Sequence, residues 1–308
     1  MFDLVIIGHF VMDLIISPKI SHPRVTLGGA ATFVSLAANK LDAKVGVISK
    51  VGKDFQKQLL WLRKANVDLS MVQIAEDAST TRLILTYYDG KRKLQLRNKA
   101  PQIVPKDIPV SLHAKVIHVA PVANELSLEV IRKLRNRTSL LSIDPQGFLR
   151  EFDEAGYMKL KGSSDVSFLQ HCDIFKSSLE EIKIVTECAK LGTAMKKVRK
   201  CGVKIVLVTM GLKGILAHLD DKFYHIPACK PKILQDPTGA GDVFIGAFLA
   251  EHIQGREPRW CCCVGSAAAS FVIEDVGSQR FGEKKEVYER ATKIYEKGIK
   301  PLAQDTVV

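Results

Sequence analysis

The sequence lacks the features of a membrane or secreted protein. No apolar run approaches the roughly 20 residues that a membrane-spanning helix needs. The start, MFDLVIIGHF, has neither a basic lead-in nor a small-residue cleavage site, which argues against a signal peptide. We therefore expect a cytoplasmic protein with no membrane partner.

Paired cysteines are also missing. The seven cysteines include no CxxC pair and show no regular spacing, so no disulfide framework is indicated. Three adjacent cysteines in WCCCVGSAAASFVI are predicted to pack as small apolar side chains on a buried helix. This cysteine usage favours a reducing compartment.

Aromatic residues are sparse, at 7%, and no basic tract is interleaved with them. The net charge of +12 instead comes from Lys and Arg spread over helical stretches such as AMKKVRKCG. Nucleic-acid binding usually shows a clustered basic face, so we do not expect a nucleic-acid partner. A basic protein that binds anionic phosphates accounts for the charge more simply.

What is present is an alternating α/β pattern in 308 residues, enough for one large core. Apolar, β-branched runs that predict strands separate the helical stretches, and they lie at 3–8, 44–52, 115–122, 139–147, 172–178 and 204–211. Residues 214–228 predict a further antiparallel pair. The expected fold is an α/β/α sandwich around a mostly parallel sheet.

Residues 82–97 break this rhythm. Two alternating runs meet at Asp89-Gly90, a dipeptide favoured in two-residue hairpin turns. We expect a small β-sheet lid, with strands inserted at about 10–28 and 80–100, on a single domain spanning 1–308.

The stretch DPTGAGDVF places small residues and a carboxylate at the start of an apolar helix. The backbone N–H groups of Gly239, Ala240 and Gly241 can approach a ligand, and a helix N-terminus favours an anion. Asp242 follows within reach of a hydroxyl held there. The alternative is a helix cap followed by small residues that allow close packing, and these nine residues alone favour neither.

Four stretches together resemble the ribokinase-like, or PfkB, family of carbohydrate kinases, in the family's order. They are GGAATFVSLAANKLDAKVGVISKVGKDF (28–55), VTMGLKG (208–214), DPTGAGDVFIGAFLAEHI (236–253) and AAASFVIEDVGSQ (267–279). The resemblance covers most of the chain. It implies a ribokinase-like fold and a phosphotransferase that uses ATP and Mg²⁺, with a monovalent cation as a further candidate cofactor.

The resemblance assigns the catalytic roles. Asp242 corresponds to the catalytic base. Gly239, Ala240 and Gly241 correspond to the anion hole that stabilises charge on the transferring phosphoryl group.

At the substrate end, Asp13 matches the family's acceptor of substrate hydroxyls, a task for which a carboxylate is suited. Gly28 and Gly29 match a hinge pair that permits close approach and lid closure. Phe33 stands where ribose-directed members usually carry Asn, which counts against a ribokinase proper. A turn residue is the alternative interpretation of Asp13.

On the nucleotide side, the resemblance points to Thr209, Gly211, Gly214 and Gly277, with Lys213 reaching a phosphate. For Lys213 a solvated loop lysine is the alternative.

The family's Asn-x-x-Glu motif, which organises Mg²⁺, is altered here. Ser178 replaces the Asn and is expected beside the nucleotide, whereas Glu181 keeps the carboxylate and is the candidate metal ligand. Glu180 is the alternative register.

The stretch DPQGFLR (144–150) resembles a segment of the myo-inositol kinases of this family. Gln146 is predicted to bridge two ring hydroxyls, and Arg150 to steady the phosphoryl charge. The alternative is a turn with a surface arginine.

The first hypothesis is therefore an ATP-dependent kinase that phosphorylates a hydroxyl of a cyclitol or sugar, with myo-inositol as the first substrate to test. A nucleoside kinase of the inosine or cytidine type is the second, with Phe33 and Tyr87-Tyr88 stacking on the base. The third is a non-catalytic module that binds a nucleotide or polyol. We expect a monomer, or a homodimer formed through the β lid.

Overall fold

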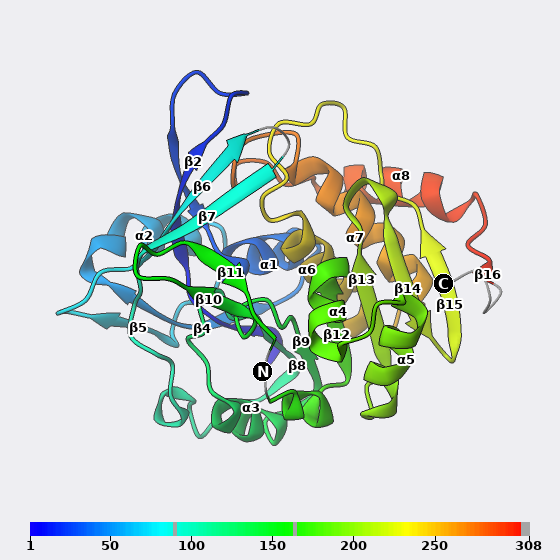
Figure 1. The fold of residues 1–308 in the computed structure, drawn as a ribbon, viewed down its shortest axis with the longest axis horizontal. Coiled ribbons are helices and arrows are strands. Elements are labelled where there is room, and N and C mark those ends of the chain that lie inside the picture. Colours follow the sequence, from blue (N-terminus) through cyan, green and yellow to red (C-terminus); the bar gives the residue numbers. More distant parts are fainter. Residues whose placement is uncertain (89–90, 163–164, 303–308) are drawn as a thin grey trace.

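The computed structural model describes residues 1–88, 91–162 and 165–302. Within them a ten-stranded sheet crosses the molecule in the order β16-β15-β14-β13-β12-β9-β8-β1-β4-β5 (Figure 1). Its strands are β1 (Phe2–Ile7), β4 (Val45–Gly52), β5 (Val72–Ala75), β8 (Ala114–Val119), β9 (Thr138–Ile143), β12 (Ile174–Ser178), β13 (Ile205–Thr209), β14 (Ile215–Leu219), β15 (Lys222–Ile226) and β16 (Pro301–Leu302). Pairing is parallel from β5 to β13 and antiparallel from β13 to β16.

Helices cover both faces of this sheet. Along β1, Leu4 and Ile6 pack into one apolar core and Val5 and Ile7 into the other, because successive side chains of a strand point to opposite faces. The first core is closed by α1 (Ala30–Asn39), α2 (Gln56–Lys64), α6 (Ala240–Ile253), α7 (Pro258–Val272) and α8 (Lys284–Tyr295), and the second by α3 (Leu128–Arg135), α4 (Leu179–Thr186) and α5 (Leu191–Lys200). Short 3₁₀ helices lie at Lys53–Phe55, Pro105–Asp107, Ser167–His171 and Gly211–Lys213. The predicted α/β/α sandwich is confirmed.

The cysteine-rich helix is buried as predicted. Cys261, Cys262 and Cys263 on α7 are fully buried and have free thiols. Among the described residues, no helix combines the length and hydrophobicity needed to cross a bilayer.

A second, four-stranded sheet has the order β3-β2-β6-β7. It contains β2 (Val11–Ile16), β3 (Arg24–Gly28), β6 (Thr81–Tyr88) and β7 (Lys91–Asn98), all within the two stretches where lid strands were expected. We call it the small sheet; Figure 1 shows β2, β6 and β7 set apart from the main sheet. β6 and β7 pair antiparallel as predicted, whereas the predicted turn at Asp89-Gly90 lies outside the described residues.

The segment after β9 differs from its prediction. The strand ends at Ile143 instead of reaching Gly147, and Phe148 N–H donates to the Pro145 carbonyl to form a turn. A short hairpin of β10 (Arg150–Phe152) and β11 (Met158–Leu160) follows and contacts β7, where Leu96 N–H donates to the Gly156 carbonyl at 2.8 Å. Three-residue strands carry too few positions for an alternating pattern, so no sequence pattern indicated this hairpin.

Candidate active site

The residues 236–241, which we call the anion-binding turn, lead into α6. Gly239 has φ 77°, and an added Cβ would lie 2.5 Å from the Phe33 ring. Both the left-handed conformation and the packing therefore require glycine at this position. The turn delivers the first N–H groups of α6, which lack intrahelical acceptors, to one place, and the positive end of the helix dipole favours an anion there.

Asp242 lies in the first turn of α6 and is half-buried. Burial raises the pKa of its carboxyl group to about 6; the nearby Lys176 opposes this shift, whereas Asp144 adds to it. Gln146 Nε2 donates to Asp242 Oδ1 at 3.3 Å. A carboxylate with a pKa close to neutral pH, at the mouth of an anion site, is suited to accept a proton from a hydroxyl.

Lys176 and Asp144 form a buried ion pair beside this carboxylate. Lys176 Nζ lies 2.5 Å from Asp144 Oδ2, and the two side chains are 7% and 0% exposed. Burial alone would lower the pKa of Lys176, but the carboxylates of Asp144, Asp242 and Glu181 together raise it above its ordinary value. A Cβ on Gly241 would lie 2.8 Å from Lys176 Nζ, so a fixed positive charge adjoins the anion-binding turn.

Asp13 faces the site from the small sheet. It is 3% exposed, and Oδ1 has no hydrogen-bond partner among the described residues. Burial raises the pKa of this carboxyl group to about 7, with Arg92 acting against the shift and Asp236 with it. A Cβ on Gly28 would overlap Asp13 Oδ2, so the glycine leaves room for the carboxylate. Such a buried, unpaired acceptor is inconsistent with an ordinary turn residue and suits a ligand hydroxyl.

Gly29 caps the N-terminus of α1. It has φ 81°, and an added Cβ would lie 2.7 Å from the Val11 side chain and 2.8 Å from the His9 carbonyl oxygen. Glycine is therefore required where β3 of the small sheet enters the helix, the position at which a hinge was predicted.

Gln146 and Arg150 are held together. Arg150 Nη2 donates to Gln146 Oε1 at 2.6 Å, and Nη1 donates to the Val122 carbonyl at 3.0 Å. Gln146 N–H also donates to Asp144 Oδ1. Arg150 is half-buried, so it is not the exposed arginine of the alternative interpretation. The hydrogen bonds of Arg150 fix Gln146 beside Asp242.

The structure corrects the prediction that Phe33 contacts the substrate. The ring is 1% exposed and fills the space behind Gly239. It supports the anion-binding turn from inside the core, and this position does not allow it to stack on a nucleobase.

A small apolar cavity of about 200 Å³ adjoins the anion-binding turn. It is reached by three of the residues predicted on the nucleotide side, Thr209, Gly211 and Gly214, and its other walls include Leu212, Ile215, Phe244 and Ile273. Ala240 and Gly241 form the end next to α6. Lys213 is exposed and does not line the cavity, which agrees with the solvated-lysine interpretation.

Two other predicted nucleotide residues have different surroundings. Gly277 has φ 65°, donates its N–H to Asp236 Oδ2, and packs on Thr26 of the small sheet. Ser178 is the N-cap of α4: its Oγ accepts from Glu181 N–H, and Glu181 Oε2 accepts from Ser178 N–H. Glu181 is thereby fixed in the first turn of α4, close enough to influence Lys176 and Asp242.

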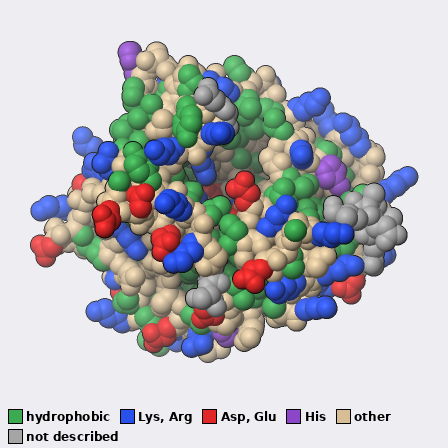
Figure 2. Space-filling view, viewed as in Figure 1, with side chains coloured by type: hydrophobic (Ala, Val, Ile, Leu, Met, Phe, Trp, Pro, Cys, Tyr) green, Lys and Arg blue, Asp and Glu red, His purple; other side chains and the backbone are tan. Residues whose placement is uncertain are grey.

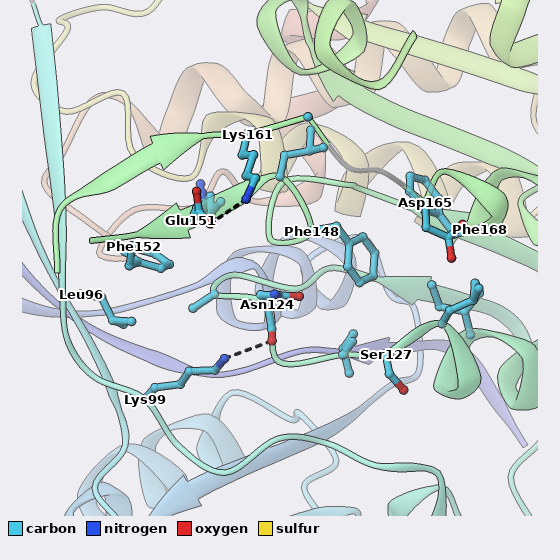
Figure 3. Close-up of a pocket in the computed structure, with 17 residues that line it drawn as sticks. Leu96, Lys99, Asn124, Ser127, Phe148, Glu151, Phe152, Lys161, Asp165 and Phe168 are labelled. Atoms are coloured by element: carbon cyan, nitrogen blue, oxygen red, sulfur yellow. Dashed lines mark hydrogen bonds and ion pairs between the residues drawn. The ribbon is translucent and has the colours of Figure 1, made fainter. Parts of the chain in front are cut away.

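A larger cavity, of about 650 Å³, opens beside Arg150 (Figure 3). Phe148 and Phe168, whose rings stack at 5.4 Å, line one side, and Leu96 and Phe152 line another. Figure 3 shows Lys99 and Asn124 below the opening and the Lys161–Glu151 pair above it. Arg150 lines this cavity and also bonds Gln146, which in turn contacts Asp242.

Charged side chains of both signs are mixed on the face that Figure 2 shows. Figure 2 shows Lys and Arg side chains scattered over one face of the molecule, with Asp and Glu between them. This agrees with the absence of a basic tract in the sequence.

Comparison with known proteins identifies the family. The sequence profile of the pfkB family carbohydrate kinases matches residues 1–285. The chain belongs to the pfkB family. It is therefore a kinase with the ribokinase-like fold, and members of this family phosphorylate hydroxyls of sugars, polyols or nucleosides.

Individual relatives differ in acceptor. The chain is 31% identical to a cytidine kinase of Thermococcus kodakarensis, over 90% of this chain and 98% of that one. It is 26% identical to an inositol 3-kinase of Arabidopsis thaliana, over 90% of this chain and 76% of that one. In structure it resembles a pyrophosphate-dependent ribokinase-family kinase complexed with a pyrophosphate analog and myo-inositol, with TM-score 0.80, 22% identity, and 93% and 99% of the two chains covered.

Several site residues were missed by sequence analysis. Asp144 directly follows β9, and Lys176 lies on the adjacent parallel strand β12. A placement toward the carboxyl ends of neighbouring parallel strands could have indicated both residues. Tyr87 was considered only as a stacking residue, and nothing in the sequence indicated that it reaches the anion-binding turn.

Proposed function

We propose that this kinase transfers the γ-phosphoryl group of ATP to a ribose hydroxyl of a nucleoside. The observation that carries the proposal is the larger cavity with its aromatic walls, Phe148 and Phe152 among them, beside Arg150. A nucleoside has a planar base beyond its sugar that can occupy such a space. A cyclitol carries hydroxyls around its ring and offers no comparable apolar part. Because of this cavity we place a nucleoside before myo-inositol as the acceptor, whereas the DPQGFLR motif favoured myo-inositol.

ATP as the donor is supported by the smaller cavity. Its apolar walls suit a nucleobase, and it ends at Ala240 and Gly241, so a triphosphate extending from it would bring its terminal group to the N-terminus of α6. Pyrophosphate, the donor named for the structural neighbour, has no part that an apolar cavity would bind.

The chain's own groups suit in-line transfer between these two sites. Asp13 would accept a hydrogen bond from the acceptor, and Asp242 would take the proton of the attacking hydroxyl as its oxygen bonds to the γ-phosphorus. The bond from that phosphorus to the β–γ bridging oxygen breaks, and ADP leaves. Lys176 and the N–H groups of the anion-binding turn would stabilise the charge on the transferring group.

The carboxylates present fit a magnesium ion. Mg²⁺ is commonly held through one or two carboxylates, waters and substrate phosphates. Among the described residues no cluster of three or more His, Cys, Asp or Glu side chains is placed to hold a metal by itself, which agrees with that mode. Glu181 would hold the ion or its waters, and the ion would neutralise charge on the nucleotide phosphates.

A second candidate acceptor is myo-inositol. Gln146, fixed by Arg150 and bonded to Asp242, presents an amide that can bridge neighbouring hydroxyls. An inositol kinase among the relatives supports the same candidate.

The test is ADP release with Mg-ATP across cytidine, inosine, myo-inositol, ribose, fructose and no acceptor, repeated with pyrophosphate as donor by measuring phosphate release. We expect the highest kcat/KM for a nucleoside and no turnover with pyrophosphate. Phe148→Ala would raise the nucleoside KM at least tenfold with little change for myo-inositol. Preference for myo-inositol, with no response to Phe148→Ala, would replace the nucleoside proposal by the second candidate.

A further inference from the structure

A tyrosine of the small sheet reaches the anion-binding turn. Tyr87 lies near the end of β6, and its hydroxyl oxygen is 2.7 Å from Thr238 Oγ1, across 151 residues of sequence. Its neighbour Tyr88 points the other way and is 47% exposed. Thr238 immediately precedes Gly239, the residue whose left-handed conformation starts α6.

The direction of the Tyr87–Thr238 hydrogen bond follows from the inventory of donors. Thr238 Oγ1 donates its only proton to Asp236 Oδ1 at 2.6 Å. Tyr87 can then donate to Thr238 Oγ1, and the Asp236 carboxylate beside it is a second acceptor for the same proton. Burial raises the pKa of the Tyr87 hydroxyl to about 12, so the proton is present throughout the neutral range.

The chain of bonds continues through Asp236. Its Oδ1 also accepts from Thr238 N–H, and its Oδ2 accepts from Gly277 N–H at 3.0 Å. Asp236 and Thr238 are 3% and 6% exposed, so the bonds are shielded from water and sensitive to the loss of one partner. A single path thus joins the small sheet, the anion-binding turn and the loop at Gly277.

We propose that Tyr87 is a positioning residue: its hydroxyl, carried by the small sheet, fixes the anion-binding turn in the form that stabilises the transferring phosphoryl group. The sheet that bears Asp13 on β2 thereby also holds the donor-side anion site in place. This rests on the proposed kinase reaction. The proposal predicts that loss of the Tyr87 hydroxyl lowers kcat, because the anion-binding turn is needed in the transition state. The acceptor KM should change little.

Other contacts of the small sheet provide controls. Lys19 Nζ donates to the Leu234 carbonyl, and Ser278 Oγ donates to the Leu27 carbonyl, so part of the docking remains when the Tyr87 hydroxyl is removed. Tyr88→Phe removes the adjacent, exposed hydroxyl and is the matched control variant.

The experiment compares steady-state kinetics of wild type, Tyr87→Phe, Tyr88→Phe, Thr238→Val, Thr238→Ser and the Tyr87→Phe/Thr238→Val double variant, with the best acceptor of the panel. We expect Tyr87→Phe and Thr238→Val each to lower kcat about tenfold with the acceptor KM within twofold of wild type. Tyr88→Phe should match wild type, and Thr238→Ser, which keeps the hydroxyl, should recover most of the kcat that Thr238→Val loses. The double variant should lose no more than the worse single variant, because both remove the same bond.

Three results would overturn the proposal. The first is a kcat of Tyr87→Phe equal to that of Tyr88→Phe, and the second is a loss of kcat in the double variant equal to the product of the two single losses. The third is a change in Tyr87→Phe confined to the acceptor KM, which would make Tyr87 an acceptor contact. Turnover by wild type tests the proposed function, whereas the ratio of kcat between Tyr87→Phe and Tyr88→Phe tests this inference. If wild type phosphorylates none of the acceptors, hydrogen exchange of residues 236–242 decides. Exchange at least threefold faster in Tyr87→Phe than in Tyr88→Phe supports the inference, and equal rates refute it.

Discussion

Replacing Asp13 by Asn should stabilise this protein more at high pH than at low pH. Asp13 is buried, its Oδ1 has no hydrogen-bond partner in the part of the chain that the structure describes, and burial raises the pKa of its carboxyl group from 3.8 to about 7. The folded state therefore binds a proton that the unfolded state has lost between these two values. The stability that Asp13 contributes is intact below about pH 4 and is lost as the pH rises to about 7.

The size of the effect follows from linkage. A difference of roughly 3 pKa units corresponds to about 4 kcal/mol of stability lost by wild type at alkaline pH, at 1.36 kcal/mol per unit. About 1.5 kcal/mol of this is already lost at pH 5, so the change between pH 5 and pH 8 is about 2–3 kcal/mol. An Asn side chain at this position contributes no such dependence of stability on pH. For a chain of this size the difference in Tm between Asp13→Asn and wild type should grow by roughly 5 °C from pH 5 to pH 8.

The assay is thermal unfolding at pH 5 and pH 8, without ligands, for wild type, Asp13→Asn and Asp77→Asn. Asp77 is exposed in the turn after β5 and serves as the matched control. Comparing two pH values removes the pH-independent cost of burying an amide in place of a carboxyl group. A difference in Tm that stays constant within about 1 °C between the two pH values would refute the interpretation of Asp13 as a buried, unpaired carboxylate.

Three further predictions concern the catalytic cluster. Asp242→Asn should lower kcat by a factor of about 10²–10⁴ while the protein stays folded, measured by ADP release and circular dichroism; near-wild-type turnover would exclude Asp242 as the base. In wild type, log(kcat/KM) for the acceptor should fall with decreasing pH below about pH 6–7, because protonation removes the base at Asp242 and the hydroxyl acceptor at Asp13; a flat profile down to pH 5 would contradict the raised pKa values. Lys176→Met should destabilise the protein by about 3–5 kcal/mol, because it leaves Asp144 buried without its ion-pair partner, and the double variant with Asp144→Asn should recover part of that loss in denaturant unfolding.

The main elements of the fold could be predicted from the sequence because each has a local cause. The parallel strands β1, β4, β8, β9, β12 and β13 come from near-continuous apolar runs, as a sheet covered on both faces requires, and β6 and β7 alternate as a half-buried hairpin does. β10 and β11 were missed because three-residue strands have no period of their own and depend on contact with β7.

Some residues of the candidate site could likewise be predicted from the sequence, and others could not. The sequence by itself determined Gly239, Gly241 and Asp242, because the special backbone of a helix start and a carboxylate beside it are local properties of one short stretch. It could not place Phe33, whose family position faces the substrate but whose ring here fills the space behind Gly239. Chain position does not say which side of a helix meets the core.

Only the tertiary structure decided which distant groups act together. The Lys176–Asp144 ion pair links β12 to the residue that follows β9, and the Tyr87–Thr238 bond links the small sheet to the anion-binding turn, 151 residues away in sequence. The burial that raises the pKa values of Asp13 and Asp242 also comes from elements that are far apart along the chain. Desolvation and hydrogen-bond direction depend on every group packed around an atom, and that arrangement exists only once the chain is folded.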